Sequence, residues 1–157
     1  MSKQLFQKAI LWIIIFFVPS ATFSQSQNMT LQSNWNEAAY HYNDIWGYVD
    51  NDNNEFAIIG SKDKVYFFNV TNPTNPQKIA EFAPGSNTSW RDIKTFDHYA
   101  YAVSEGLTNE GLVIFDLCAI GDGIVRQIYQ ENTDFGKAHN IFIDVTTEIL
   151  YLSLIHI

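Results

Sequence analysis

Three versions of one short segment decide the fold: Asn43-Asp44-Ile45-Trp46-Gly47-Tyr48, Arg91-Asp92-Ile93-Lys94-Thr95-Phe96 and His139-Asn140-Ile141-Phe142-Ile143-Asp144. Asp44, Asp92 and Asn140 follow one another at intervals of 48 residues. Self-similarity at a fixed period of 20–50 residues is the mark of a repeat architecture, in which each repeat is one supersecondary unit. We therefore interpret the chain as a series of repeats with one common start.

Each repeat predicts four short β-strands. The opening segment is followed by a turn rich in Asp and Asn, and then by two strands that are apolar almost throughout, as expected inside a packed sheet. The predicted strands after the openings are residues 56–60, 65–70 and 78–82, then 99–104, 112–117 and 125–129, and finally 149 onward. Four antiparallel strands per repeat of this length are typical of a β-propeller blade. The fold class is thus all-β, a propeller truncated at about two and a half blades.

The chain divides accordingly. Residues 1–24 are predicted to be a signal peptide, 25–42 a leader, 43–90 the first blade, 91–138 the second and 139–151 the start of a third. Residues 152–157 read Leu-Ser-Leu-Ile-His-Ile, which matches the translation of an adapter used in sequencing libraries. We expect this end to be an artefact, so His156 enters no site.

The first 24 residues have the three parts of an export signal. Lys3 and Lys8 are basic, residues 9–18 are an unbroken apolar run, and small residues after Pro19 offer a cleavage site before Gln25. Ten apolar residues span only about 15 Å as a helix, roughly half of a bilayer core. We expect cleavage, no transmembrane span afterwards, and a protein that is extracellular or at the cell surface.

Charge and cysteine content narrow the partners. The formal net charge is −8, and an acidic surface does not favour nucleic acid, whose phosphates call for a basic patch. Cys118 is the only cysteine and cannot form an internal disulfide. No Lys, Arg or His adjoins it in the sequence, so we predict an inert structural thiol.

The repeat openings, together with Phe56-Ala57-Ile58-Ile59-Gly60 and Leu112-Val113-Ile114-Phe115-Asp116, resemble choice-of-anchor B proteins, which are built from LVIVD repeats. The resemblance covers residues 28–151. It implies an extracellular β-propeller that is secreted or fixed to the surface by a C-terminal anchor or sorting module, here expected to be lost by truncation. It implies no agreed activity.

The 48-residue register itself indicates where a ligand could bind. In a propeller the first strand of each blade lines the central channel, so equivalent positions form rings. The candidate ligand-binding residues are therefore Asp44, Arg91, Asp92, His139 and Asn140. No cofactor is evident, although such a ring could hold a divalent cation such as calcium or a small anion. The alternative is structural, with these groups satisfying one another and nearby backbone.

The leading function is a binding or scaffold module for an extracellular ligand or protein, and an enzyme is the less favoured interpretation. The alternative is a secreted hydrolase or lyase with its site at the channel mouth, which is less favoured because no catalytic motif occurs in the sequence. Residues 50–54 resemble the start of a calcium-binding loop. The residues that follow lack the glycine and the final Glu of such a loop, so we expect a hairpin turn. Glu105 and Glu110 lie in a glycine-containing loop and are expected to be solvated.

Overall fold

The computed structural model describes residues 29–37, 41–85, 88–106 and 109–153, so the predicted signal peptide lies outside the described residues. The chain forms two compact units, residues 1–31 and 32–157, and the account that follows concerns the second. The described residues contain ten β-strands, one short 3-10 helix at Ile120–Asp122 and no α-helix. The expected all-β class is confirmed.

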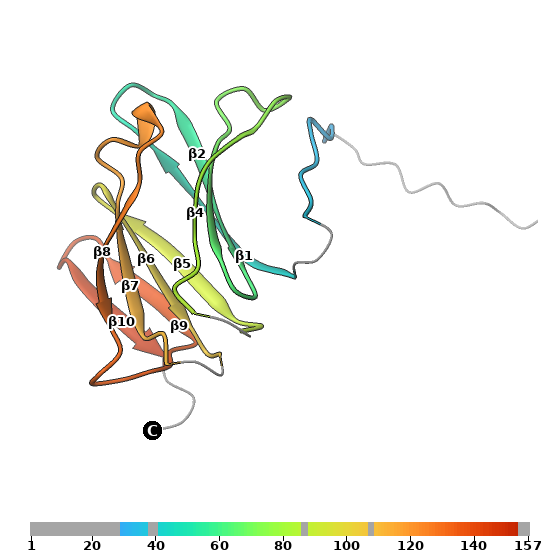
Figure 1. The fold of residues 1–157 in the computed structure, drawn as a ribbon. Helices are drawn as coiled ribbons and strands as arrows, with labels where there is room; N and C mark the ends of the chain where they lie inside the picture. Colours follow the sequence, from blue (N-terminus) through green and yellow to red (C-terminus); the bar gives the residue numbers. More distant parts are fainter. Residues whose placement is uncertain (1–28, 38–40, 86–87, 107–108, 154–157) are drawn as a thin grey trace, which may run out of the picture. The chain divides into compact units, whose positions relative to one another are not determined.

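The strands form three antiparallel sheets in which neighbours in sequence are neighbours in space (Figure 1). The first sheet comprises β1 (Tyr42–Val49), β2 (Glu55–Ser61), β3 (Val65–Asn69) and β4 (Gln77–Phe82). The second comprises β5 (Arg91–Phe96), β6 (Tyr99–Ser104), β7 (Leu112–Asp116) and β8 (Arg126–Glu131), and the third is the hairpin of β9 (Asn140–Asp144) and β10 (Ile149–Ser153). Every strand predicted from the sequence overlaps one of these. Leu152 and Ser153 complete β10, whereas residues 154–157 lie outside the described residues.

The turn after the first strand of each sheet contains one residue with positive φ. Asn53, Asp97 and Glu148 have φ values of 61°, 51° and 58°, and they are the non-glycine residues with positive φ among those described. Asn and Asp tolerate this left-handed conformation better than most residues. Asp50 Oδ1 also accepts the N–H groups of Asp52 and Asn54 at 2.9 and 2.8 Å, so residues 50–54 form the expected hairpin turn.

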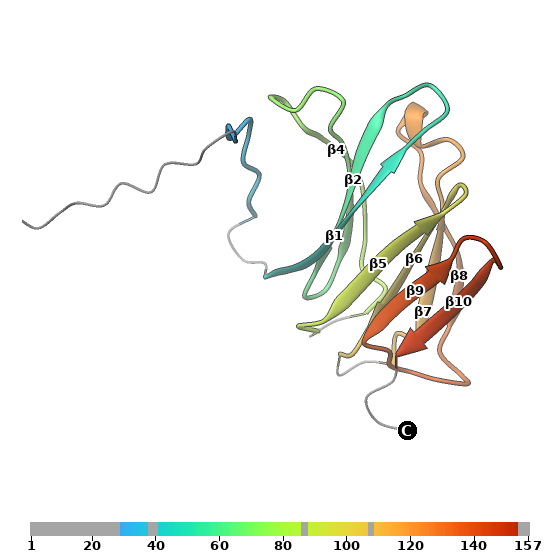
Figure 2. The same ribbon diagram turned by 180° about the vertical axis from the view of Figure 1, so that it is seen from behind.

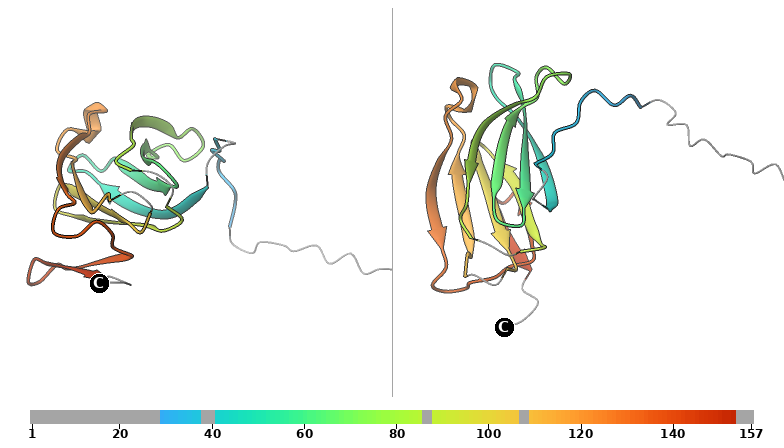
Figure 3. Two further views of the ribbon diagram at one scale, coloured as in Figure 1. Left: turned by 60° about the horizontal axis from the view of Figure 1, so that its bottom comes forward. Right: turned by 45° about the vertical axis from the view of Figure 1, so that its right-hand side comes forward.

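Packing of one sheet against the next supplies the core. The apolar faces of the first two sheets meet in a buried cluster that includes Phe56, Ile58, Phe67, Ile93 and Phe115. The opposite face of the second sheet packs on the third through Val103, Ala138 and Ile141. Figure 3 shows the three sheets as successive layers. Alternate residues of the central strands thus face two different neighbours, which explains their continuous hydrophobicity.

The first strands β1, β5 and β9 lie side by side, as Figure 2 shows from behind. This arrangement brings the starts of the three repeats together, and it positions the candidate site described next. The described residues contain four-stranded antiparallel sheets but no closed ring of sheets.

Candidate functional site

All five candidate residues predicted from the 48-residue register line one pocket of about 320 Å³. Asp44 comes from β1, and Arg91 and Asp92 come from the start of β5. Asn140 begins β9, and His139 directly precedes it. Tyr42, Asn43, Ser89 and Trp90 complete the lining of this polar pocket. The sequence therefore predicted correctly that these positions lie together.

Asp44 and Asp92 each connect one sheet to the next. Asp44 Oδ2 accepts the backbone N–H of Ile93 at 2.8 Å, and Asp92 Oδ2 accepts that of Ile141 at 2.6 Å. Each bond joins residues that are 49 positions apart in the sequence, so the two bonds are equivalent in the repeat. Because Ile93 and Ile141 are buried, an unpaired N–H there would cost about 1–3 kcal/mol. Each carboxylate therefore has a structural role, whatever else it does.

Lys94 lies between these two carboxylates. Its ammonium donates to Asp92 Oδ1, lies 3.8 Å from Asp44 Oδ2, and is 4.2 Å from the centre of the Trp46 ring. A divalent cation bound between Asp44 and Asp92 would have to displace this ammonium. Calcium at this position stays a prediction, and sequence reasoning did not include Lys94 in the site.

The two carboxyls differ in pKa because their partners differ. Burial raises the pKa of Asp44, and the neighbouring Asp92 carboxylate raises it further. Burial alone would also raise the pKa of Asp92, but hydrogen bonds from Lys94 and from the Ile141 N–H outweigh it and hold that pKa below its usual value. Asp92 is the carboxylate that keeps its charge more firmly.

Arg91 borders the pocket, but its guanidinium is buried and paired inside the protein. Its guanidinium forms a bidentate ion pair with Glu110, with Nη2 to Oε2 at 2.9 Å, and both side chains are fully buried. Arg91 Nε donates to the Ser61 carbonyl of the first sheet at 3.1 Å, and Ser104 Oγ donates to Glu110 Oε2 at 3.0 Å. The expectation that Glu110 is solvated is wrong. The buried guanidinium requires a counterion, and the chain path after β6 brings Glu110 to it.

His139 and Asn140 form the side of the pocket nearest the third sheet. His139 Nδ1 lies 2.7 Å from Glu105 Oε2, and its ring is 5.9 Å from that of Trp90, which is 55% exposed. The side chain of Asn140 makes no hydrogen bond to another described residue. Asn43 Oδ1 accepts the N–H of Asp44 at 3.1 Å. Glu105, expected to be solvated, is partly buried beside His139.

The electrostatic result is that the charged groups of the pocket are already paired within the protein. Arg91 is balanced by Glu110, Lys94 lies beside Asp92 and Asp44, and Glu105 faces His139. The uncharged residues of the lining include Asn43, Asn140 and Trp90, and the Trp90 ring is exposed. Charge pairing of this kind favours a ligand that forms hydrogen bonds without carrying a net charge.

Comparisons with protein-family profiles, with curated proteins and with solved structures find no match to this chain. In the part of the chain that the structure describes, no helix has the length and apolar character needed to cross a membrane.

Proposed function

We propose that this chain belongs to an exported β-propeller and acts as a binding module, with a small ligand held in the polar pocket. The observation that carries the proposal is the convergence of the repeat starts: one pocket is lined by residues that recur at a 48-residue interval on β1, β5 and β9. In a propeller, equivalent positions of successive first strands face the central channel, where ligands are commonly recognised. The resemblance to LVIVD-repeat proteins supports the same interpretation.

Packing on both faces of the second sheet supports the propeller architecture. One face of the third sheet packs against the second sheet. On the other face, Phe142 and Tyr151 are 65% and 51% exposed. Their rings lie 6.2 Å apart and form an aromatic surface of the kind that a further sheet would cover. If no such sheet covers it, the purified protein should self-associate. A protein that stays monomeric at high concentration would contradict this part of the proposal.

The ligand that fits best is neutral and rich in hydroxyl groups, such as a sugar ring. Amide groups of Asn43 and Asn140 can donate and accept hydrogen bonds, and the exposed Trp90 face offers an apolar surface beside them. An anion would meet Asp44 and Asp92, and a cation would compete with Lys94. These paired charges make either ion a poorer fit than a neutral ligand.

The test is a titration of the purified protein with neutral mono- and oligosaccharides, with CaCl₂ and sodium phosphate in parallel, followed by tryptophan fluorescence. Asn140→Ala should weaken sugar binding at least about tenfold and leave stability within about 0.5 kcal/mol, because the Asn140 side chain makes no hydrogen bond to another residue in the described part of the chain. Asp92→Ala should lose stability because the Ile141 N–H is left unpaired. Binding of calcium alone, or equal losses of binding and stability in Asn140→Ala, would refute the sugar proposal.

One observation favours a second function, a hydrolase or lyase. The His139 imidazole paired with Glu105 at the pocket is the arrangement that orients a general base. His139→Asn would abolish turnover of a bound saccharide in an enzyme. If the protein is a binding module, the unsubstituted protein should form no product, and His139→Asn should change only the affinity for the saccharide.

A further inference from the structure

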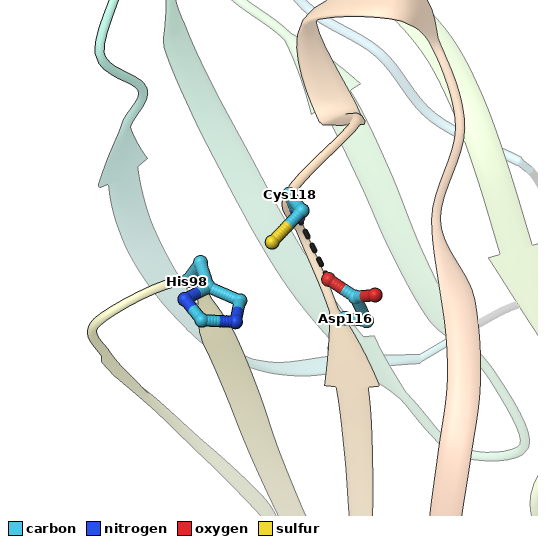
Figure 4. Close-up of side chains that lie close together, drawn as sticks. All are labelled: His98, Asp116 and Cys118. Atoms are coloured by element: carbon cyan, nitrogen blue, oxygen red, sulfur yellow. Dashed lines mark hydrogen bonds between the residues drawn. The ribbon is translucent and has the colours of Figure 1, made fainter.

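A second group of functional side chains lies at the opposite end of the second sheet from the polar pocket. His98 lies in the turn between β5 and β6, Asp116 ends β7, and Cys118 follows two residues later. One ligand atom from each of the three lies within 4.8 Å of the others, and Figure 4 shows the side chains facing a shared space. We propose that these residues, the His98 cluster, form a binding site for a divalent transition-metal ion, with Zn²⁺ as the best fit.

The local backbone holds the three residues in place. The N–H of Leu117 donates to the His98 carbonyl at 2.8 Å, which ties the β5–β6 turn to the end of β7. The N–H of Cys118 donates to Asp116 Oδ1 at 2.9 Å, which fixes the turn that carries both residues. Asp116 therefore lies at the end of a strand, and His98 and Cys118 lie in turns that these backbone bonds tie to it.

The donor set suits zinc. Thiolate, imidazole and carboxylate are its protein ligands, at about 2.0–2.3 Å from the ion, so bound ligand atoms lie about 3.3–3.8 Å apart. The ligand atoms of the cluster lie within 4.8 Å of one another, so they would have to move closer together around a bound ion. Calcium takes oxygen ligands and would not use Cys118 or His98. Three protein ligands leave a fourth position of the tetrahedron for water.

Asp97 supplies the outer partner that zinc-binding histidines commonly have. Its Oδ2 lies 2.9 Å from His98 Nδ1, which leaves Nε2 as the nitrogen for an ion. A carboxylate in this position fixes the orientation of the imidazole ring.

The first sheet shows that the turn itself does not require these residue types. The positions equivalent to His98, Asp116 and Cys118 are Glu55, Asn69 and Thr71, as the matched strand registers show. The same backbone bonds recur: Val70 N–H to the Glu55 carbonyl at 2.8 Å, and Thr71 N–H to Asn69 Oδ1 at 3.0 Å. An amide and a hydroxyl thus satisfy the fold. The carboxylate, thiol and imidazole of the second sheet add metal-binding chemistry that the turn does not need.

The surroundings attract cations. His98 and Cys118 line a pocket of about 420 Å³ between the ends of the first two sheets, with Asp50, Asp52 and Asp122 also in its wall. Carboxylates lining one cleft raise the local concentration of cations. Desolvation and the Asp116 carboxylate raise the pKa of the Cys118 thiol, so it carries its proton at neutral pH. Metal binding would release that proton to solvent and form the sulfur–metal bond.

The experiment is a titration of the reduced, purified protein with Co²⁺, followed by displacement with Zn²⁺. Because Cys118 is the only cysteine, a thiolate-to-cobalt charge-transfer band can arise from no other residue. We expect one ion per chain and loss of the band on addition of Zn²⁺. Cys118→Thr should abolish the band. Asp116→Asn and His98→Gln should each lower Zn²⁺ affinity at least about tenfold, and Asp97→Asn by about 10–100-fold.

Two of these variants introduce residues that the same turn already contains in the first sheet. Cys118→Thr and Asp116→Asn introduce the residues that the first sheet has at the same positions, so unchanged circular dichroism is expected. His139→Asn removes a histidine outside the cluster and should leave the metal titration unchanged. The absence of a charge-transfer band at millimolar Co²⁺ would overturn the proposal. So would a band that survives both Asp116→Asn and His98→Gln, or one ion shared by the thiolates of two chains.

Discussion

The substitution Glu110→Gln tests how much the buried ion pair holds the first two sheets together. Gln keeps the size of the side chain but removes the charge that balances Arg91, and both side chains are fully excluded from solvent. Arg91 cannot lose its proton at accessible pH, so its guanidinium would remain charged and buried without a counterion. It would retain the Ser61 carbonyl, which carries only a partial charge.

We expect the free energy of unfolding to fall by about 3–5 kcal/mol, the usual cost of removing one partner from a buried pair. The measurement is urea denaturation followed by fluorescence and circular dichroism together, so that agreement of the two probes tests for a single transition. Glu81→Gln is the matched control. Glu81 pairs with Lys64 and Lys78 at 2.7 Å each, but at the surface, where such pairs contribute about 0–1 kcal/mol.

A loss in Glu110→Gln of no more than about 1 kcal/mol would refute the reasoning, because it would mean that water or another group compensates the guanidinium. The double variant Arg91→Met, Glu110→Leu replaces both charged side chains of the pair by apolar side chains. We expect the double variant to be more stable than Glu110→Gln, since an apolar pair leaves no buried charge unbalanced.

Three further predictions concern single contacts. Asp44→Ala should speed amide hydrogen exchange at Ile93, and Asp92→Ala should speed it at Ile141, because each carboxylate accepts one of these N–H groups. Neither variant should change exchange at the other amide. Equal acceleration at both amides would contradict this prediction. Gly111→Ala should destabilise by more than the roughly 1–3 kcal/mol of strain at its φ of 66°, because its Cβ would lie 1.6 Å from the Glu131 carbonyl oxygen. Gly123 has a φ of 76° and open space around it, so Gly123→Ala should lower stability in thermal melts only by the backbone strain. Glu131 has its pKa lowered to about 2 by bonds from Thr133, Asp134 and Tyr129. Its charged form therefore adds stability above its usual pKa of 4.5, and this stability is lost as the pH falls from there to about 2. Glu131→Gln should flatten the stability curve over that interval in acid titrations, and an unchanged slope would contradict the assignment.

Most of the fold could be predicted because its determinants are local. Almost continuous apolar runs indicated the inner strands. The Asn and Asp residues of the first turns indicated the hairpins, two of which contain Asn53 and Asp97 at positive φ. The polar pocket could also be predicted, since a 48-residue register places equivalent residues on adjacent first strands. The partners of those residues could not, because Lys94 and Glu110 have no special spacing relative to Asp44 or Arg91.

The sequence by itself determined the repeat, the strands and the positions that line the polar pocket, because these follow from periodicity along the chain. Only the tertiary structure decided the chemistry of those positions. It paired Arg91 with Glu110, placed Lys94 beside Asp92, and brought His98 to within reach of Cys118, whose sequence neighbours had indicated an inert thiol. The physical reason is that charge and coordination depend on distance in space. Sheet packing sets those distances between residues that are 2 to 49 positions apart in the sequence.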